Sequence, residues 1–285
     1  MFLKKKLTWL ASLLIIASGL IGWQAFSGSP GVLTVAILDV GQGDSIFIET
    51  PNGKQVLIDG GATKKVLLEL GKVMPVGDNS LDLVIATHPD KDHIGGLIPV
   101  LENYDVSQIL ESPVEGTTKT FSIFKDAVAK EKSDRVLAEA GQTILLDSAN
   151  NIYLKILWPG KVASGVLTNE AAIVAELVFG ESEFLFTADI PAFVEETLAA
   201  SFPEEINTDV LKVAHHGSRY SSSFNFLEAA SPDVAVISAG KNNSYGHPHK
   251  DTLGRLTKLK IPILGTYDEG TIIFESDGSV IRRVR

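Results

Sequence analysis

Hydrophobic and polar positions form several short, strand-like stretches at the start of the main body of the chain. Segments 33–38, 45–49 and 55–59 are rich in apolar and β-branched residues and have the length of β-strands. Turn-forming runs at residues 39–44 and 51–54 separate them, and the second contains an Asn-Gly pair. The pattern predicts an antiparallel meander of three strands before the first strong helix signal.

Farther along, strand-like and helix-like segments alternate. Strands are expected at residues 83–86, 172–179, 183–186, 210–214 and 234–238, and helices at residues 121–132, 192–202, 223–230 and 252–258. Two β-rich halves with helices between the strands favour an α/β fold in which two mixed sheets form a sandwich with outer helices. Residues 113–141 carry the weakest pattern, and we interpret them as an insertion over the site.

The N-terminal segment differs from this body. Three lysines at positions 4–6 precede an uncharged, mostly apolar run that reaches about Phe26, and the next charged residue is Asp39. About twenty helical residues can cross a hydrocarbon core of roughly 30 Å, and the preceding lysines favour a cytoplasmic N-terminus. Residues 1–31 are therefore predicted to be a signal or anchor helix with a tether, and residues 32–285 a single domain outside the cytoplasm. The protein would be a single-pass membrane protein, or secreted if this segment is cleaved.

Charge and cysteine content narrow the chemistry. The formal net charge of −10 disfavours a broad nucleic-acid-binding face, because such faces depend on Lys and Arg. Bound divalent cations would reverse the potential inside a carboxylate-rich cleft, so a phosphodiester substrate is compatible with this charge. The absence of cysteine excludes disulfides, thiolate metal sites and cysteine nucleophiles.

One short segment concentrates four potential metal ligands. His88, Asp90, Asp92 and His93 lie within six residues, directly after the expected strand at 83–86. Imidazole nitrogen and carboxylate oxygen are ligands for borderline divalent cations. The segment therefore predicts a site for two metal ions.

This motif resembles the signature of the metallo-β-lactamase superfamily. Asp90 stands where the usual signature has its second histidine, and the same form is found in the extracytoplasmic hydrolase domain of ComEC-type DNA-uptake competence proteins. Further similar segments follow in order at residues 39–45, 57–61, 186–189, 211–218 and 245–249. The resemblance extends over roughly residues 33–275 and implies an αββα sandwich.

The resemblance also implies a distribution of ligands over two metal ions, Zn²⁺ or Mn²⁺. His88 and Asp90 would hold the first ion, Asp92 and His93 the second, and Asp189 would bridge both. Asp92 is also counted as catalytic. Asp189 ends an expected strand, as a rigidly presented bridging carboxylate should, although a helix N-cap is the alternative reading of this residue.

The next ligand is expected at His215 or His216, at the end of the strand 210–214. Strand geometry would send only one of the two inward, and we favour His216 without excluding His215. The first ion is one ligand short of the common pattern, because no isolated histidine occurs between His93 and His215. Asn169 lies where ComEC-type proteins have a polar residue.

Two further aspartates and two histidines are candidates for supporting roles. Asp59 resembles the family's first acidic motif and is expected to orient a ligand or a loop, and Asp44 is expected to hold the neighbouring loop. Turn aspartates are the alternative reading. His247 and His249 are candidate catalytic groups that would bind a phosphate oxygen or protonate the leaving group, unless they are ordinary loop histidines.

Ser218, Lys241 and Asn243 lie near these histidines and are candidate substrate-binding residues. A pair of metal ions suits phosphodiester hydrolysis, and the ComEC-type resemblance implies DNA as the substrate. A separate channel protein would then carry the DNA, because this chain has only one expected membrane segment. Two alternatives are a hydrolase of another phosphodiester, such as a phosphocholine-type ester, and a non-catalytic surface module that binds metal or DNA.

Overall fold

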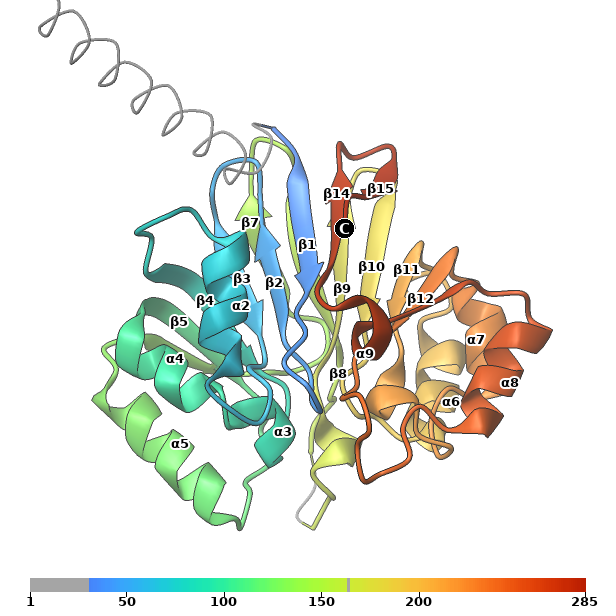
Figure 1. The fold of residues 1–285 in the computed structure, drawn as a ribbon, viewed down its shortest axis with the longest axis horizontal. Helices are drawn as coiled ribbons and strands as arrows, with labels where there is room; N and C mark the ends of the chain where they lie inside the picture. The colour runs from blue at the N-terminus through green and yellow to red at the C-terminus, as the bar shows by residue number, and fades with distance from the viewer. Residues whose placement is uncertain (1–30, 163–164) are drawn as a thin grey trace, which may run out of the picture.

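Two β-sheets lie face to face, and helices cover the outer side of each sheet (Figure 1). The computed structural model describes residues 31–162 and 165–285. The expected sandwich of two mixed sheets with outer helices is confirmed.

The first sheet has eight strands in the order β15-β14-β1-β2-β3-β4-β5-β6. Pairing is antiparallel from β15 to β3 and parallel from β3 to β6, and the predicted meander is β1-β2-β3. The strands are β1 Leu33–Ile37, β2 Ile46–Glu49, β3 Gln55–Ile58, β4 Ser80–Ala86, β5 Asp105–Glu111, β6 Asp134–Leu137, β14 Ile272–Ser276 and β15 Ile281–Arg283.

The second sheet has seven strands in the order β13-β12-β11-β10-β9-β8-β7. Here β10 to β13 are parallel, and β7 to β10 are antiparallel. The strands are β7 Thr143–Asp147, β8 Ile152–Trp158, β9 Val174–Phe179, β10 Ser182–Phe186, β11 Val210–Lys212, β12 Val234–Ile237 and β13 Ile263–Gly265. Each sheet thus has one parallel half.

The helices divide between the two outer faces (Figure 1). Beside the first sheet lie α2 Lys65–Val73, α3 Lys91–Ile94, α4 Leu97–Asn103 and α5 Lys119–Lys130, and beside the second lie α6 Ala192–Ser201, α7 Phe224–Ala230 and α8 Lys250–Lys258. The short elements are η1 Asn169–Ala171, η2 Ala214–Gly217 and α9 Thr266–Glu269.

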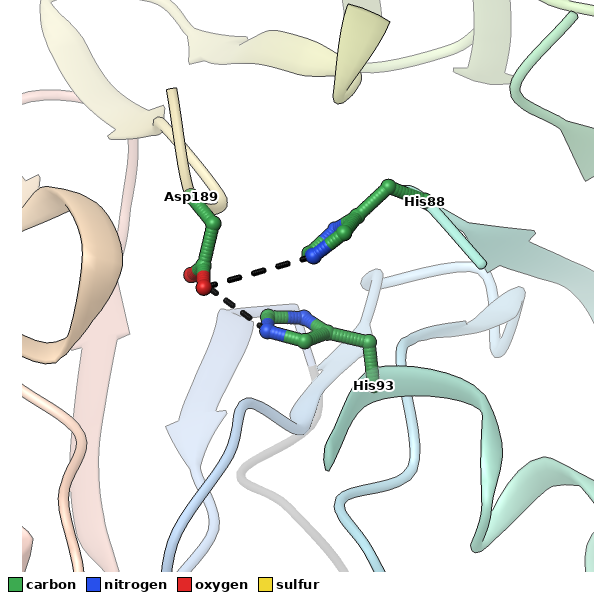
Figure 2. Close-up of side chains that lie close together, drawn as sticks. All are labelled: His88, His93 and Asp189. Carbon is green, nitrogen blue, oxygen red and sulfur yellow. Dashed lines mark ion pairs between the residues drawn. The ribbon is translucent and has the colours of Figure 1, made fainter. Parts of the chain in front are cut away.

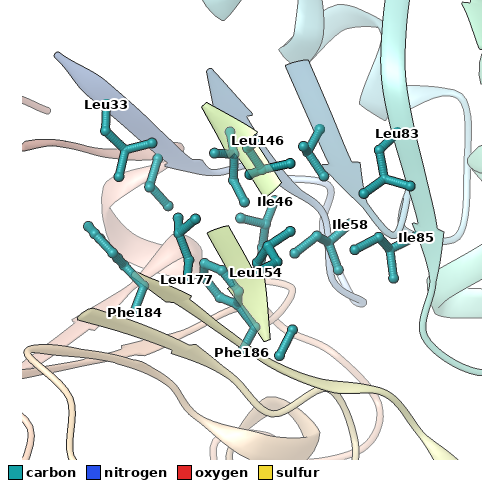
Figure 3. Packing of buried hydrophobic residues seen from close by; sticks show 14 of the residues in the cluster. Leu33, Ile46, Ile58, Leu83, Ile85, Leu146, Leu154, Leu177, Phe184 and Phe186 are labelled. Carbon is teal, nitrogen blue, oxygen red and sulfur yellow. The ribbon is translucent and has the colours of Figure 1, made fainter. Parts of the chain in front are cut away.

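The central strands are buried on both faces, which explains their nearly continuous apolar sequences. In β1, Val35 and Ile37 point into the core between the sheets, whereas Ala36 packs under the helices of the first sheet. In β10, Phe184 and Phe186 point into the central core and Leu185 packs under the other helix layer. Figure 3 shows part of the central cluster, where side chains from both sheets interdigitate.

The interpretation of residues 113–141 as an insertion over the site is wrong for most of the segment. It forms α5 and β6, and Phe124 and Val128 of α5 are buried against the first sheet. β6 is an edge strand whose Asp134, Arg135 and Leu137 are exposed, so it lacks the apolar pattern of a central strand. This partial exposure accounts for the weak signal in the sequence.

The predicted apolar helix of residues 1–31 lies, except for its last residue, outside the described part of the chain. Within residues 31–162 and 165–285, no helix has the length and apolar character needed to span a membrane.

Replacing Phe184 tests the central core. Its side chain is fully buried, and its ring lies 6.4 Å from that of Phe186 and 6.3 Å from that of Phe274. We expect Phe184→Ala to lower the free energy of unfolding by about 3–5 kcal/mol, because it removes a large apolar side chain and leaves a cavity. Urea denaturation measures the change, with the exposed Leu145→Ala as a control; similar losses in both variants would contradict this description of the core.

Candidate metal centre

The parallel halves of both sheets end at one edge of the sandwich, and the candidate ligands follow these strands. Asp59 follows β3 and His88 follows β4 in the first sheet, whereas Asp189 follows β10 and His216 follows β11 in the second. Ligands of open α/β sheets commonly bind beyond the carboxyl ends of parallel strands. The fold therefore brings together residues that are far apart in the sequence.

The first group of potential ligands consists of His88, His93 and Asp189 (Figure 2). The Nε2 atom of His93 lies 3.3 Å from Oδ1 of Asp189, and Nε2 of His88 lies 4.0 Å from Oδ2 of the same carboxylate. All three residues are buried. Both imidazoles thus direct one nitrogen toward a shared carboxylate.

The second group consists of Asp92, His93 and His216, and it also lies against Asp189. Nε2 of His216 is 3.4 Å from Oδ2 of Asp92 and also 3.4 Å from Oδ2 of Asp189. Asp92, His93 and His216 have ligand atoms within 4.8 Å of one another. Asp189 is therefore close to the imidazoles of both groups.

Asp90 stands at the border of the first group. Its Oδ2 atom is 3.9 Å from Nε2 of His88, and its side chain is 42% exposed. Burial raises the pKa of Asp90, and a hydrogen bond with the Thr168 side chain opposes this shift. Asn169 begins η1 next to Thr168, so the segment that lacks the family's isolated histidine still lies against this side of the centre.

Asp59 fixes the orientation of both histidines in the first group. Its Oδ2 atom accepts a hydrogen bond from Nδ1 of His93 at 2.7 Å and another from the Thr87 hydroxyl at 2.6 Å. Because the Thr87 proton is used in this way, its oxygen accepts from Nδ1 of His88 at 3.0 Å. Both histidines therefore carry a proton on Nδ1, and this orientation directs Nε2 at the centre.

His216 is oriented by an equivalent contact on the second sheet. Its Nδ1 atom lies 3.0 Å from the carbonyl oxygen of Ser238, which can only accept, so the proton is again on Nδ1. Burial and the His93 imidazole lower the pKa of His88 to about 3, which keeps it a neutral lone-pair donor. Burial alone would also lower the pKa of His93 and His216, but the carboxylates around them, Asp189 foremost, raise it well above its usual value.

These residues fit a metal centre because their inward-facing atoms lack other partners. Nε2 of His88, His93 and His216 and Oδ1 of Asp189 are buried without a hydrogen-bond partner among the described residues. A buried polar atom left unpaired costs about 1–3 kcal/mol, so four that converge on one space would be strongly unfavourable without a ligand. Divalent cations that accept nitrogen and oxygen ligands would satisfy all four.

His215 and His216 both approach Asp189, so the expectation that only one of them points inward is wrong. Nε2 of His215 is 3.6 Å from Oδ2 of Asp189. The pair lies in η2 with left-handed backbone angles, φ 51° and 55°, and not in a strand, so strand alternation does not apply. His216 is buried, whereas the His215 side chain is 30% exposed and faces the solvent side of the centre.

A buried ion pair beneath the centre was missed at the sequence level. Nζ of Lys212 lies 2.6 Å from Oδ2 of Asp44, and both side chains are almost fully buried. Asp44 Oδ1 lies 3.2 Å from Nδ1 of His216. Burial raises the pKa of Asp44, but Lys212 and His216 outweigh it and lower the pKa overall. A lysine between the apolar residues Leu211 and Val213 of a buried strand is the signal that could have revealed the pair.

The two loop histidines have different surroundings. The His247 ring lies 5.6 Å from that of His215 and 6.2 Å from that of His216, and its Nδ1 atom is buried without a partner among the described residues. Burial and the two neighbouring imidazoles lower its pKa to about 4. His249 instead caps α8 by accepting the N–H of Asp251, so its ring is used structurally.

The three residues predicted to bind substrate are engaged elsewhere. Asn243 accepts the N–H groups of Tyr245 and His247 and so holds its own loop. Lys241 is exposed and lies 3.9 Å from Asp268. Ser218 is buried, its carbonyl accepts from Thr252, and its hydroxyl oxygen accepts from the N–H of Tyr220, so each of the three has a partner outside the ligand cluster.

Comparison with known proteins assigns the family. A sequence profile of the Metallo-beta-lactamase superfamily matches residues 38–241 of this chain. The chain belongs to this superfamily. The match includes every candidate ligand, from His88 to His216, and excludes the loop histidines.

The superfamily members most informative about this chain are competence proteins. The chain is 31% identical over 264 residues to ComE operon protein 3 of Bacillus subtilis. The matched region covers 84% of this chain and 32% of the relative. It is 26% identical to Competence protein ComA of Neisseria gonorrhoeae, over 91% of this chain and 35% of the relative. The chain thus spans about a third of the length of these curated relatives.

Two solved structures superimpose on most of the chain, and the first is described as a metallo-β-lactamase fold protein. YhfI from Bacillus subtilis gives a TM-score of 0.57 at 15% identity and covers 86% of this chain and 100% of its own. Zn²⁺-bound PqqB from Methylobacterium extorquens superimposes with a TM-score of 0.54 at 11% identity. The match covers 82% of this chain and 97% of the PqqB chain. These similarities confirm the fold that the sequence predicted.

The role of Asp59 can be tested by metal affinity. We expect Asp59→Ala to weaken Zn²⁺ or Mn²⁺ binding by about 10–100-fold, because His93 loses its orienting carboxylate and Thr87 loses its acceptor. Competition with a chromophoric chelator measures the change, and Asp126→Ala on the exposed face of α5 is the matched control. Equal affinity of the two variants would show that Asp59 does not orient the ligands.

The ion pair can be tested by a double-mutant cycle. We expect Lys212→Met to lower the free energy of unfolding by about 3–5 kcal/mol, because Asp44 is then a buried charge without its main partner. Adding Asp44→Asn should recover part of this loss. Urea denaturation of the wild type, the two single variants and the double variant gives the coupling energy, and strictly additive losses would contradict the proposed pairing.

Proposed function

We propose that this chain is a binuclear metal-dependent phosphodiesterase that acts on DNA. The observation that carries the proposal is the convergence of three inward-facing Nε2 atoms, each buried without a hydrogen-bond partner among the described residues, on the carboxylate of Asp189. His88, Asp90 and Asp189 would hold one ion, and Asp92, His93, His216 and Asp189 the other. Zn²⁺ and Mn²⁺ are the candidate ions, because the ligands combine imidazole nitrogen with carboxylate oxygen.

Two bound ions at such a centre supply a hydroxide at neutral pH and neutralise charge that develops on the phosphate. The residues of this chain contribute the remaining functions. Asp189 fixes the spacing of the two ligand groups, and Asp59 and Ser238 keep the imidazoles in the ligating tautomer. His215 and His247 lie at the open side, where an imidazole can contact a phosphate oxygen or protonate a leaving group.

DNA is the proposed substrate because the similar proteins are named for competence, and a phosphodiester suits a centre of two cations. We further propose that residues 1–31 anchor the chain in the membrane with the catalytic domain outside the cytoplasm. A separate channel protein would then act as its partner in DNA uptake. The fold alone does not specify a substrate, so another phosphodiester, such as a phosphocholine-type ester, is the principal competing substrate. A non-catalytic metal- or DNA-binding module would keep the ligands without turnover.

Metal-dependent cleavage of DNA by the full chain tests the proposal. We expect Mn²⁺- or Zn²⁺-dependent cleavage of labelled DNA that a chelator abolishes. Asp92→Ala should lower the rate by more than about 100-fold, since loss of a direct ligand should cost at least as much as loss of a residue that orients one. Asp126→Ala serves as the control with an unchanged metal centre.

The other outcomes separate the alternatives. Hydrolysis of p-nitrophenylphosphocholine without cleavage of DNA would replace the proposed substrate. Stoichiometric metal binding, measured by elemental analysis, without hydrolysis of either substrate would support the non-catalytic module.

A further inference from the structure

An open pocket of about 470 Å³ lies directly beside the metal centre. His215 belongs to both, because its ring lines the pocket while its Nε2 atom is 3.6 Å from Asp189. Its lining also includes Glu115, Leu167, Glu170, Phe193 and Tyr220. A substrate held at the metals therefore has a neighbouring cavity within immediate reach.

Two aromatic side chains form the exposed wall of this pocket. Phe193 is 55% exposed and Tyr220 is 70% exposed, and Leu167 beside them is 67% exposed. Each aromatic residue is on a segment that carries a ligand: Phe193 follows Asp189 at the start of α6, and Tyr220 follows His216 after η2. Apolar side chains gathered in the open beside a polar centre are typical of a binding surface and costly without one.

The backbone under this wall is held rigidly. The N–H of Ala192 donates to the carbonyl of Tyr220 at 2.9 Å, which ties the two aromatic segments together. The buried carboxylate of Glu195 accepts the N–H groups of Ser222 and Ser223 at 2.6 and 2.8 Å, and Arg255 donates to the Ser222 carbonyl at 2.7 Å. The wall is therefore preorganised, which reduces the entropy lost on binding.

The chemistry of the pocket favours a flat, uncharged aromatic ligand. Its lining includes Glu115 and Glu170 and, among the described residues, no lysine or arginine, so a phosphate group is repelled. Phe and Tyr rings offer stacking faces, and the carboxylates can accept hydrogen bonds from exocyclic amino groups. His215 marks an edge where the phosphate would leave the pocket for the metal centre.

From these observations we infer that the pocket binds an unpaired nucleobase adjacent to the phosphate at the metal centre, with Phe193 and Tyr220 as the stacking wall. The inference rests on the proposed function and extends it to single-stranded substrates, because a base that is stacked and paired in a duplex cannot enter. Stacking on aromatic side chains tolerates every base, so little sequence preference is expected.

Equilibrium binding can test the pocket independently of cleavage. The probes are a fluorescently labelled phosphorothioate single strand, which resists hydrolysis, and a strand of equal length and charge in which every base is replaced by an abasic site. We expect the metal-loaded full chain to bind the strand with bases about tenfold more tightly than the abasic strand, as measured by fluorescence anisotropy.

Variants of the two aromatic residues test whether the preference for the strand with bases arises in this pocket. Phe193→Ala and Tyr220→Ala should each remove most of the affinity ratio between the two strands, whereas Phe193→Trp and Tyr220→Phe should retain it because an aromatic face remains. The exposed Leu145→Ala in β7, a residue that does not line the pocket, is the control that keeps the ratio.

Equal affinity for both strands, or a preference that survives both alanine variants, would overturn the inference while DNA cleavage could still support the proposed function. Binding of neither strand would also overturn it, and the cleavage assay would then decide the proposed function separately. Hydrolysis of p-nitrophenylphosphocholine that Phe193→Ala and Tyr220→Ala abolish would overturn it too, since aromatic and acidic groups also suit a quaternary ammonium ion.

Discussion

The buried ion pair between Lys212 and Asp44 is the contact on which the geometry of the metal centre depends. It crosses from the second sheet to a loop of the first sheet at a distance of 2.6 Å, where neither charge is accessible to water. The backbone of Asp44 also donates to the Asp92 carbonyl and accepts from Gly61. One residue therefore ties together the loops after β1, β3 and β4 and the end of β11. Two charges removed from water are tolerated only with such good partners, so the pair fixes how the two sheets meet.

The same edge of the sandwich contains several strained backbone positions that are not glycines. Asp59, Ala188, His215 and His216 all have positive φ angles between 43° and 59°. Residues with side chains adopt this region at a cost, and glycine would adopt it freely. At Asp59 and the two histidines the side chain contacts a ligand or Asp189, so glycine cannot replace it. At these three positions the strain is explained by the requirement that the backbone turn sharply after a strand while still presenting a functional side chain.

The features that depend on residues close together in the sequence were mostly predicted from the sequence. The antiparallel meander and the four ligands of the 88–93 segment depend on residues that are close in sequence, and the structure has both the meander and the convergence of His88 and His93 on Asp189. Lys212 was missed because its role depends on a partner far away in the sequence. The expected strand alternation at His215 and His216 was wrong because the chain leaves the strand at Lys212, and the left-handed turn that follows is not visible in an apolar pattern. The edge strand β6 was missed because it is largely exposed.

An acidic protein can act on DNA if the phosphate is attracted at one place and the base is bound at another. With a net charge of −10, the protein surface as a whole repels phosphate. Bound cations would supply a local positive potential at the ligand cluster, and the adjacent aromatic wall would supply affinity that does not depend on phosphate charge. Few phosphate contacts release few counterions, so binding to such a protein should vary only weakly with salt. A protein that binds DNA along a basic groove would show a steep salt dependence. An acidic enzyme of this form can therefore act on a strand end or a short unpaired segment and release it readily.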